Sequence, residues 1–257
     1  MYLLESKDEF FRLEQQATQD LYSVKEELEK FDLSQCTSVL DAGCGAGACS
    51  DYLLTHYPKL SVYGCDLSEI RISQIKKKYP HLSQNFFVST LQDLQDHQKK
   101  YDLVITRFVL QHISDYEAAL ESISKVLNPE GKIIIIEGDE MIFNITSNDI
   151  VLTSMLDKLK KEFKFHMNIG RELPPALKRL GFKDIEWDMS PMVFKNADIK
   201  KEIVNTEQRF SFIKNELVKI FGSSAKFEDF RNRYLSAIAS SENVFFANKF
   251  IISAQID

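Results

Sequence analysis

The stretch VLDAGCGAGA, residues 39–48, places three glycines and one aspartate in a single predicted turn. Gly43, Gly45 and Ala48 match the G-x-G-x-x-G/A spacing of dinucleotide-binding folds, in which glycines allow a tight turn and a close approach of the backbone to a cofactor. A short apolar run precedes the turn, and apolar residues at helical spacing follow it. The sequence therefore predicts a strand, a cofactor-binding turn and a helix.

Strands and helices alternate outward from this turn, which is typical of a parallel sheet. Pro58 ends the first helix, and the run KIIIIEGD is apolar enough to be a buried central strand. We expect strands in residues 37–43, 60–68, 85–90, 101–108 and 132–139, and helices in residues 48–57, 69–79 and 116–127.

The C-terminal part of the chain follows a different pattern. Helices are expected in residues 148–163 and 173–181, and residues 184–194 and 243–255 read as two strands that pair antiparallel. About 45 residues with two amphipathic faces separate those strands, far more than a hairpin needs. We expect four parts: an N-terminal helical cap (1–34), a cofactor-binding core (35–195), a helical insertion or lid (196–243) and the last core strand (244–257). A purely structural role for the inserted helices remains the alternative.

Composition excludes several classes of protein. The 257 residues are 44% hydrophobic and 27% charged, with a net charge of −6. No apolar run approaches the roughly 20 residues that span a bilayer, and the acidic balance disfavours a nucleic-acid partner. The first residues lack the basic and apolar regions of a secretory signal. We therefore expect a cytoplasmic protein with no membrane or nucleic-acid partner, either a monomer or a homodimer.

No metal site is expected. The four cysteines have no C-x-x-C spacing and fall in or beside core elements, so they read as core thiols rather than zinc ligands or disulfides.

Asp41, two residues before the first glycine, distinguishes between possible cofactors. A dinucleotide places its pyrophosphate at the following helix N-terminus, where this carboxylate would repel it. A ligand with an ammonium group and no phosphate is attracted instead, and S-adenosylmethionine carries both an ammonium and a sulfonium. Asp66, about 20 residues past the glycines, is placed to accept both ribose hydroxyls, a contact that NAD would share. Its alternative role is to cap the next helix.

Four stretches together resemble the class I S-adenosylmethionine-dependent methyltransferases: VLDAGCGAG, GCDLS, YDLVITRFVLQHI and VLNPEGKIIIIEGD. The resemblance covers roughly residues 36–140 and extends weakly to residue 185 towards the ubiquinone- and menaquinone-type small-molecule enzymes. It implies an α/β, Rossmann-like, doubly wound sheet of seven mostly parallel strands with an antiparallel C-terminal hairpin. The helical insertion matches no pattern of the family.

The resemblance also implies roles for individual residues in binding S-adenosyl-L-methionine and its product S-adenosyl-L-homocysteine. Asp41 is expected near the methionine ammonium, Asp66 on the ribose and Leu67 on the adenine face. The backbone of the turn is expected to line the cofactor, at Gly43, Cys44, Gly45 and Gly47. Thr90 and Leu91 stand where the family often has an aspartate followed by alanine, so the adenine contacts there are expected from a hydroxyl and a backbone amide.

Candidate acceptor-side residues follow the fourth and fifth strands. Arg107 is expected at the cofactor, facing the methyl group. His112 is a candidate general base that titrates near neutral pH, and Glu137 is a second catalytic candidate. The structural alternative for His112 is a hydrogen bond at a helix start. The alternative for Glu137 is a cap.

Motifs for adenine, amide or cytosine methylation and for hydrolases are absent, which leaves a small organic acceptor methylated at O, N or C. Phenylalanines of the expected lid and of the N-terminal helices would form apolar walls, so we expect an apolar or aromatic acceptor. The alternatives are an NAD(P)-dependent oxidoreductase and a catalytically inactive cofactor-binding scaffold.

Overall fold

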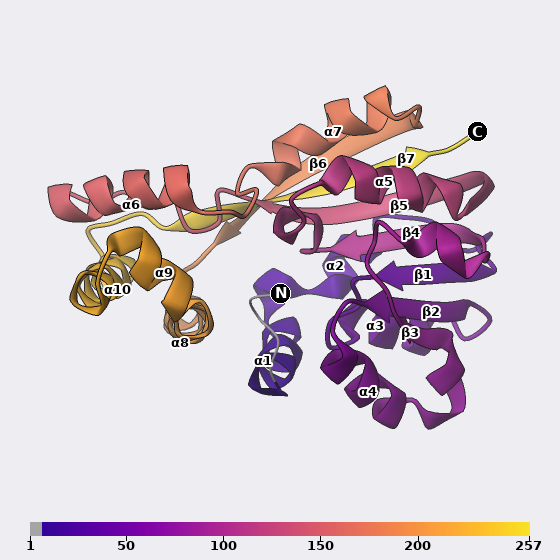
Figure 1. The fold of residues 1–257 in the computed structure, drawn as a ribbon, viewed down its shortest axis with the longest axis horizontal. Coiled ribbons are helices and arrows are strands. Elements are labelled where there is room, and N and C mark those ends of the chain that lie inside the picture. The colour runs from indigo at the N-terminus through magenta and orange to yellow at the C-terminus, as the bar shows by residue number, and fades with distance from the viewer. Residues whose placement is uncertain (1–6) are drawn as a thin grey trace.

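The computed structural model describes residues 7–257, so the first six residues of the expected 1–34 cap lie outside the described part. Seven strands form one sheet in the order β3-β2-β1-β4-β5-β7-β6 (Figure 1). Neighbouring strands from β3 to β5 are parallel, and β7 is antiparallel to both β5 and β6. The predicted α/β fold with antiparallel C-terminal strands is confirmed. The strands are β1 Ser38–Ala42, β2 Ser61–Asp66, β3 Phe86–Val88, β4 Tyr101–Arg107, β5 Leu127–Asp139, β6 Lys183–Val193 and β7 Phe246–Gln255.

Helices cover both faces of the sheet and also form a separate group beyond it. The α-helices of the described residues are α1 Lys7–Ala17, α2 Val24–Leu28, α3 Ala48–His56, α4 Glu69–Lys78, α5 Tyr116–Lys125, α6 Ile150–Glu162, α7 Ile169–Arg179, α8 Ala197–Phe212, α9 Lys214–Phe221 and α10 Ser224–Ala239.

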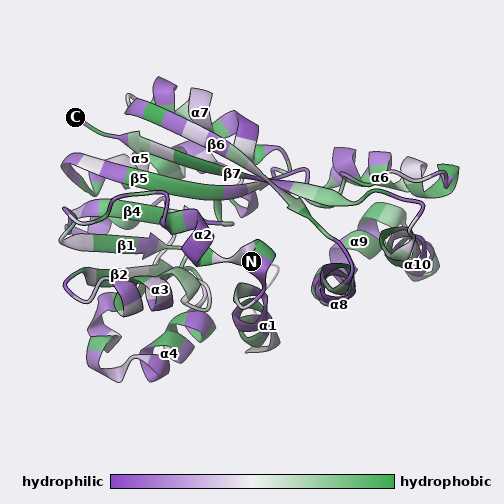
Figure 2. Ribbon diagram, turned by 180° about the vertical axis from the view of Figure 1, so that it is seen from behind, coloured by the Kyte–Doolittle hydropathy of each residue, from purple (hydrophilic) through white to green (hydrophobic). Residues whose placement is uncertain are grey.

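Successive residues of the central strands pack on opposite faces of the sheet. Leu40 and Ile133 belong to an apolar core beneath α5 and α7, whereas Val39 and Ile134 belong to a core beneath α2 and α3. Strands buried on both faces need apolar side chains at every position, which explains the uniform run in β5. Figure 2 shows these strands as hydrophobic bands between helices of mixed hydropathy.

Four helices, α6 and α8–α10, form a helical lobe with its own apolar core. The lobe lies beyond the end of the sheet to which β1 points (Figure 1). Phe210, Leu217 and Phe230 pack there with Leu152 and Leu159 of α6. The predicted insertion, residues 196–243, did not include α6. The apolar face of α6 packs on α9 and α10, so this helix joins the lobe although it precedes β6.

Two elements begin four or more residues before their predicted starts. β5 begins at Leu127 rather than Lys132, because Leu127 pairs with Tyr101 before a register shift. α7 begins at Ile169 and contains two prolines, whereas the sequence pattern predicted a start at Leu173. Ile169 is fully buried in the sheet core, so its packing favours an earlier start than the prolines indicate.

Candidate cofactor and acceptor site

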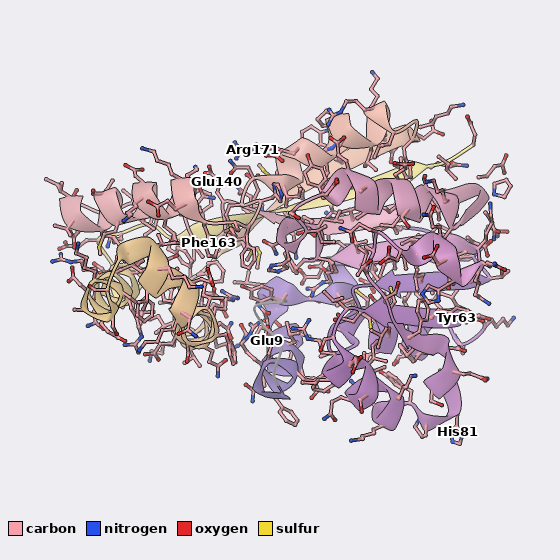
Figure 3. All side chains as sticks on the ribbon, in the orientation of Figure 1. Glu9, Tyr63, His81, Glu140, Phe163 and Arg171 are labelled. Atoms are coloured by element: carbon pink, nitrogen blue, oxygen red, sulfur yellow. The ribbon has the colours of Figure 1, made fainter. Side chains whose placement is uncertain are left out.

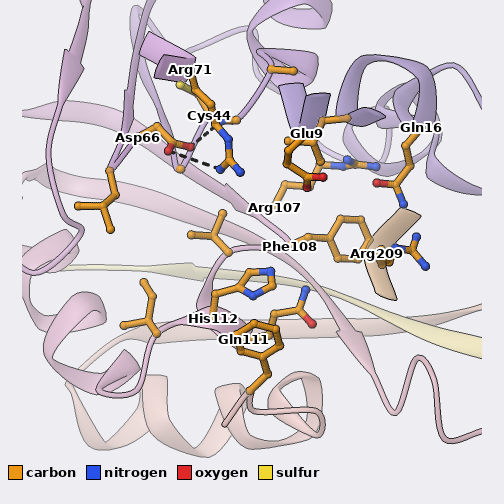
Figure 4. Close-up of a pocket in the computed structure, with 18 of the residues that line it drawn as sticks. Glu9, Gln16, Cys44, Asp66, Arg71, Arg107, Phe108, Gln111, His112 and Arg209 are labelled. Atoms are coloured by element: carbon orange, nitrogen blue, oxygen red, sulfur yellow. Dashed lines mark hydrogen bonds and ion pairs between the residues drawn. The ribbon is translucent and has the colours of Figure 1, made fainter. Parts of the chain in front are cut away.

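A cavity of about 520 Å³ lies at the carboxyl ends of the parallel strands. Its walls come from α1, the turn after β1, the segments after β2, β3 and β4, and α8 (Figure 4). Figure 3 shows Glu9 on the α1 side and Phe163 on the side of α6. Ten of the predicted site residues line this cavity: Asp41, Gly43, Cys44, Gly45, Asp66, Leu67, Thr90, Leu91, Arg107 and His112. Gly47 and Glu137 are not among the lining residues.

The turn after β1 presents backbone rather than side chains to the cavity. Gly43 has φ +78, and a Cβ there would lie 2.5 Å from Cγ2 of Val109. Its N–H and that of Cys44 each donate to the carbonyl of Cys65 at 2.8 Å. Gly47, in the left-handed region, caps α3 and donates its N–H to the Cys44 carbonyl at 2.7 Å. Gly47 therefore stabilises the turn without lining the cavity.

Asp41 is buried at the end of β1 with one oxygen already engaged. Its Oδ2 accepts hydrogen bonds from the backbone N–H and the hydroxyl of Ser50, at 3.0 and 2.7 Å. Burial raises the pKa of this carboxyl to about 6, against the lowering effect of the Ser50 bonds. Within the described residues Oδ1 has no hydrogen-bond donor, and an ammonium group in the cavity would supply one. The arrangement supports the predicted contact with the methionine ammonium.

Asp66 is held at the end of β2 by bonds to two backbone amides. Its Oδ2 accepts from the Gly45 N–H and its Oδ1 from the Ser68 N–H, both at 2.9 Å. Arg71, which the sequence analysis did not single out, forms an ion pair with Oδ1 at 3.6 Å. The carboxylate thus joins the glycine turn to α4 and still lines the cavity, where a ribose would be placed.

The segment after β3 lines the same end of the cavity. The Thr90 hydroxyl donates to Oδ2 of Asp93 at 2.6 Å, and the Asp93 N–H donates back to that hydroxyl at 3.2 Å. Leu91 is buried, whereas Leu67 after β2 is half exposed. The positions fit an adenine contact, with Thr90 held in place by Asp93.

Arg107 ties the N-terminal segment to the sheet. Its Nε donates to Glu27 at 2.6 Å and its Nη2 to the Tyr22 carbonyl at 2.7 Å. Lys249 of β7 forms a second ion pair with Glu27, also at 2.6 Å. Burial disfavours the charged form of Arg107. The attraction of Glu27 outweighs this effect, so the pKa of Arg107 is raised. Arg107 borders the cavity mainly as the anchor of α2.

His112 lines the cavity, with its ring edge-on to Phe165 at a centroid distance of 4.6 Å. Burial, together with the nearby charges of Arg71 and Arg12, lowers its pKa to about 4. The prediction that His112 titrates near neutral pH is wrong, because a buried imidazole beside two guanidinium groups disfavours protonation. At neutral pH the ring is uncharged.

Glu137 lies inside β5, fully buried and away from the cavity. Its Oε1 accepts the backbone N–H groups of Val109 and Leu110, at 2.7 and 2.6 Å. Burial raises its pKa to about 8 despite these bonds. In this structure the side chain supports the loop after β4 and does not contact the acceptor space.

No sequence pattern indicated the residues of the cavity wall opposite the cofactor side. Gln16 and Tyr22 come from the N-terminal segment, and Arg209 comes from α8. The only sequence signal for Arg209 was its place beside Phe210 and Ile213 on an otherwise apolar helix face. A charge at such a boundary is common on surface helices, so it carries little information before the fold is known.

Between residues 7 and 257 no helix is long and apolar enough to cross a bilayer. The same residues bring together no group of three or more His, Cys, Asp or Glu side chains that could hold a metal ion. All four cysteines are free thiols, and Cys36, which lies just before β1, is only half-buried.

Comparisons with known proteins place the chain in a family. The sequence model described as a methyltransferase domain matches residues 40–133. A juvenile hormone acid O-methyltransferase from Bombyx mori is 24% identical over 85% of this chain and 85% of its own length. A demethylmenaquinone methyltransferase from Chlamydia pneumoniae is 32% identical over 39% of this chain and 44% of its own.

A solved structure shares the fold. Phosphoethanolamine N-methyltransferase 2 of Haemonchus contortus, in complex with S-adenosyl-L-methionine, superposes with a TM-score of 0.61 at 18% identity. The superposition covers 98% of this chain, which spans only 57% of that one. With the glycine turn, the two strand-end carboxylates and the sheet order, these similarities identify the chain as a class I S-adenosylmethionine-dependent methyltransferase.

Proposed function

We propose that this methyltransferase acts on a small organic acceptor held between the strand ends and the helical lobe. The observation that carries the proposal is the continuity of one cavity. It runs from Asp41 and Asp66 on the cofactor side to Phe108, Phe165 and Phe210 on the other side. Cofactor and acceptor would share this single cavity.

The residues around the cavity supply binding and positioning. When bound, S-adenosylmethionine would supply an electrophilic methyl group: the lone pair of the acceptor would form the new bond to the methyl carbon, and the C–S electron pair would stay on sulfur. Asp41 would hold the methionine ammonium and Asp66 the ribose, and the backbone of the glycine turn would lie against the cofactor. Aligning the reacting atoms at about 3 to 3.5 Å supplies much of the rate enhancement of such displacements.

The far side of the cavity favours an apolar body for the acceptor. Aromatic and aliphatic side chains reach it from the segment after β4, from the segments before and after α6, and from α8 and its C-terminal cap: Phe108, Met141, Ile142, Phe163, Phe165, Phe210 and Ile213. The names of the similar proteins indicate different acceptors: juvenile hormone acid in one, demethylmenaquinone in another and phosphoethanolamine in a third. The acceptor class must therefore be argued from this cavity.

We further propose that residues 196–243 act as a lid together with the N-terminal segment of residues 1–34. Both supply cavity walls in the described part of the chain, through α8 and α1. Closing these walls would keep water away from the sulfonium centre during transfer.

The proposed function is tested by following labelled methyl groups. The purified chain is incubated with S-adenosylmethionine labelled in the methyl group and a fractionated metabolite extract. We expect label in a small, apolar-bodied compound and stoichiometric S-adenosylhomocysteine. Label in RNA or protein would contradict the small acceptor. Cofactor binding with no transfer to any fraction would indicate the inactive scaffold.

A further inference from the structure

Tyr22 joins three parts of the molecule at the acceptor end of the cavity. Its backbone carbonyl accepts from Arg107 of β4, at 2.7 Å. Its hydroxyl donates to Glu202 of α8 at 3.1 Å and accepts from Arg209 of the same helix at 3.0 Å. The side chain is 1% exposed, so these bonds are shielded from solvent. We call Tyr22, Arg107, Glu27, Lys249, Glu202 and Arg209 the Tyr22 cluster.

The Tyr22 cluster contains more positive than negative charge. Glu27 is shared by Arg107 and Lys249, each at 2.6 Å, and Glu202 pairs with Arg209 at 2.6 Å. Three cations therefore face two carboxylates, all with side chains at most 22% exposed. An uncompensated charge in such surroundings is costly unless a counter-ion approaches.

Other carboxylates along the cavity have partners of their own. Glu9 forms a buried ion pair with Arg12 at 2.6 Å, and Asp66 pairs with Arg71. Asp41 would face the ammonium group of the cofactor under the function proposed above. Asp41 and Arg107 also attract one another, so an ammonium group drawn to Asp41 would leave the positive charge of the Tyr22 cluster in excess.

Arg209 places one of these three cations in the cavity wall. Its bonds to Glu202 and Tyr22 use one hydrogen on Nη1 and one on Nη2. Between residues 7 and 257 its other three N–H groups have no hydrogen-bond acceptor, and the residue lines the cavity (Figure 4). Glu202 is also bonded by Tyr22, Asn205 and Thr206, so it fixes the guanidinium without consuming all its donors.

We propose that Arg209 is the subsite for an anionic oxygen group on the acceptor, and that the acceptor is an apolar-bodied carboxylic acid. The proposal rests on the proposed function, because it assigns the acceptor of that site. A planar guanidinium held by an ion pair suits a planar carboxylate. The neighbouring Phe210, Ile213 and Phe108 suit the apolar body. A single excess charge matches a carboxylate better than a doubly charged phosphate.

The test measures binding to the S-adenosylhomocysteine-saturated chain by calorimetry. The probes are octanoate, dodecanoate and phenylbutyrate, each with the matching primary alcohol and methyl ester, and dodecyl phosphate. We expect carboxylates to bind at least about tenfold more tightly than their alcohols and esters, since a charged hydrogen bond is gained. Arg209→Gln should remove this preference and leave the affinity for S-adenosylhomocysteine unchanged.

Arg231→Gln is the matched control, because Arg231 belongs to α10, pairs with Glu207 and Glu228 and lies outside the cavity lining. It should keep the full preference for carboxylates. If Arg209→Gln does not fold, the comparison of acid, alcohol and ester on the unaltered chain still tests the proposal. Equal binding of the three, a preference for the phosphate, or an unchanged preference in folded Arg209→Gln would overturn it.

Methyl transfer separates this inference from the proposed function. Transfer to a neutral acceptor that Arg209→Gln leaves unchanged would refute the carboxylate subsite while the function stands. Carboxylates that bind through Arg209 with no acceptor of any class methylated would refute the function while supporting the subsite.

Discussion

At the scale of single residues, Asp41 connects cofactor binding to pH. Its pKa is raised to about 6 from the ordinary 3.8, so protonation of Asp41 stabilises the folded chain when no ligand is bound. That contribution is complete below pH 3.8 and is lost as the pH rises through about 6. The ionised form is the one that attracts the cofactor's ammonium.

We therefore predict that the affinity for S-adenosylhomocysteine falls as the pH drops below about 6, by up to about tenfold per pH unit. Calorimetry across this range measures it. Asp41→Asn should bind weakly and show a flat profile between pH 5 and 7, and a wild-type slope in that variant would assign the dependence to another group.

Asp66 is predicted to hold the ribose. Asp66→Ala should weaken S-adenosylhomocysteine binding by about 1.5 to 3 kcal/mol, roughly ten- to a hundredfold, because charge-assisted hydrogen bonds are lost. Isothermal calorimetry on the folded variant provides the value. An unchanged affinity would mean that Asp66 serves only its bonds to Gly45, Ser68 and Arg71.

Substitutions of Glu137 distinguish a structural role of this side chain from a catalytic one. Burial raises its pKa to about 8, so it is largely protonated at neutral pH. Glu137→Gln should keep both stability and methyl transfer, because an amide oxygen can still accept from Val109 and Leu110. Glu137→Ala should cost about 2 to 4 kcal/mol in urea unfolding, since two buried N–H groups lose their acceptor. Loss of transfer in a stable Glu137→Gln would restore the catalytic role.

At the scale of elements, the N-terminal segment and α8 are joined by buried polar contacts. Gln19 exchanges hydrogen bonds with Asn205 at 3.1 and 3.4 Å, beside the bonds of Tyr22 to Glu202 and Arg209. Two walls of the cavity are thus linked directly to one another, and Arg107 links them to β4.

We predict that Tyr22→Phe raises hydrogen exchange in both α1 and α8, because one hydroxyl serves both walls. A loss of about 1 to 3 kcal/mol in local protection is expected for these buried bonds. The strand β5 should stay protected. Thr153→Val on α6, whose exposed hydroxyl bonds only the Asp149 carbonyl, is the control and should leave both segments unchanged. Faster exchange in α8 alone would mean that the two walls move independently.

At the scale of the whole molecule, the cofactor should stabilise the fold selectively. S-adenosylhomocysteine at about 100 times its Kd adds about 2.7 kcal/mol, which corresponds to about 5 to 10 °C in the melting temperature of a chain this size. NADH should give no shift, since the ionised Asp41 repels a pyrophosphate. Differential scanning fluorimetry with both ligands measures this, and a shift with NADH would favour an oxidoreductase.

The order and pattern of residues 36–140 were sufficient to predict the five parallel strands, the glycine turn and the cofactor. Local rules explain this success: Gly43 and Gly45 need positive φ, β5 needs apolar residues on both faces, and Asp41 and Asp66 follow parallel strands whose carboxyl ends meet at one edge. Each of these signals lies within a few neighbouring residues, so tertiary packing does not change it.

The acceptor side depended on contacts between residues far apart in the chain. Tyr22 and Arg209 are separated by 187 positions, and no local pattern indicates that they meet. His112 kept its predicted place at the cavity, but its pKa depends on burial and on Arg71 and Arg12, which only the folded chain brings near. Glu137 likewise lies beneath the loop after β4 rather than at the acceptor. Burial and long-range charge are properties of the packed molecule, and the sequence alone does not contain them in readable form.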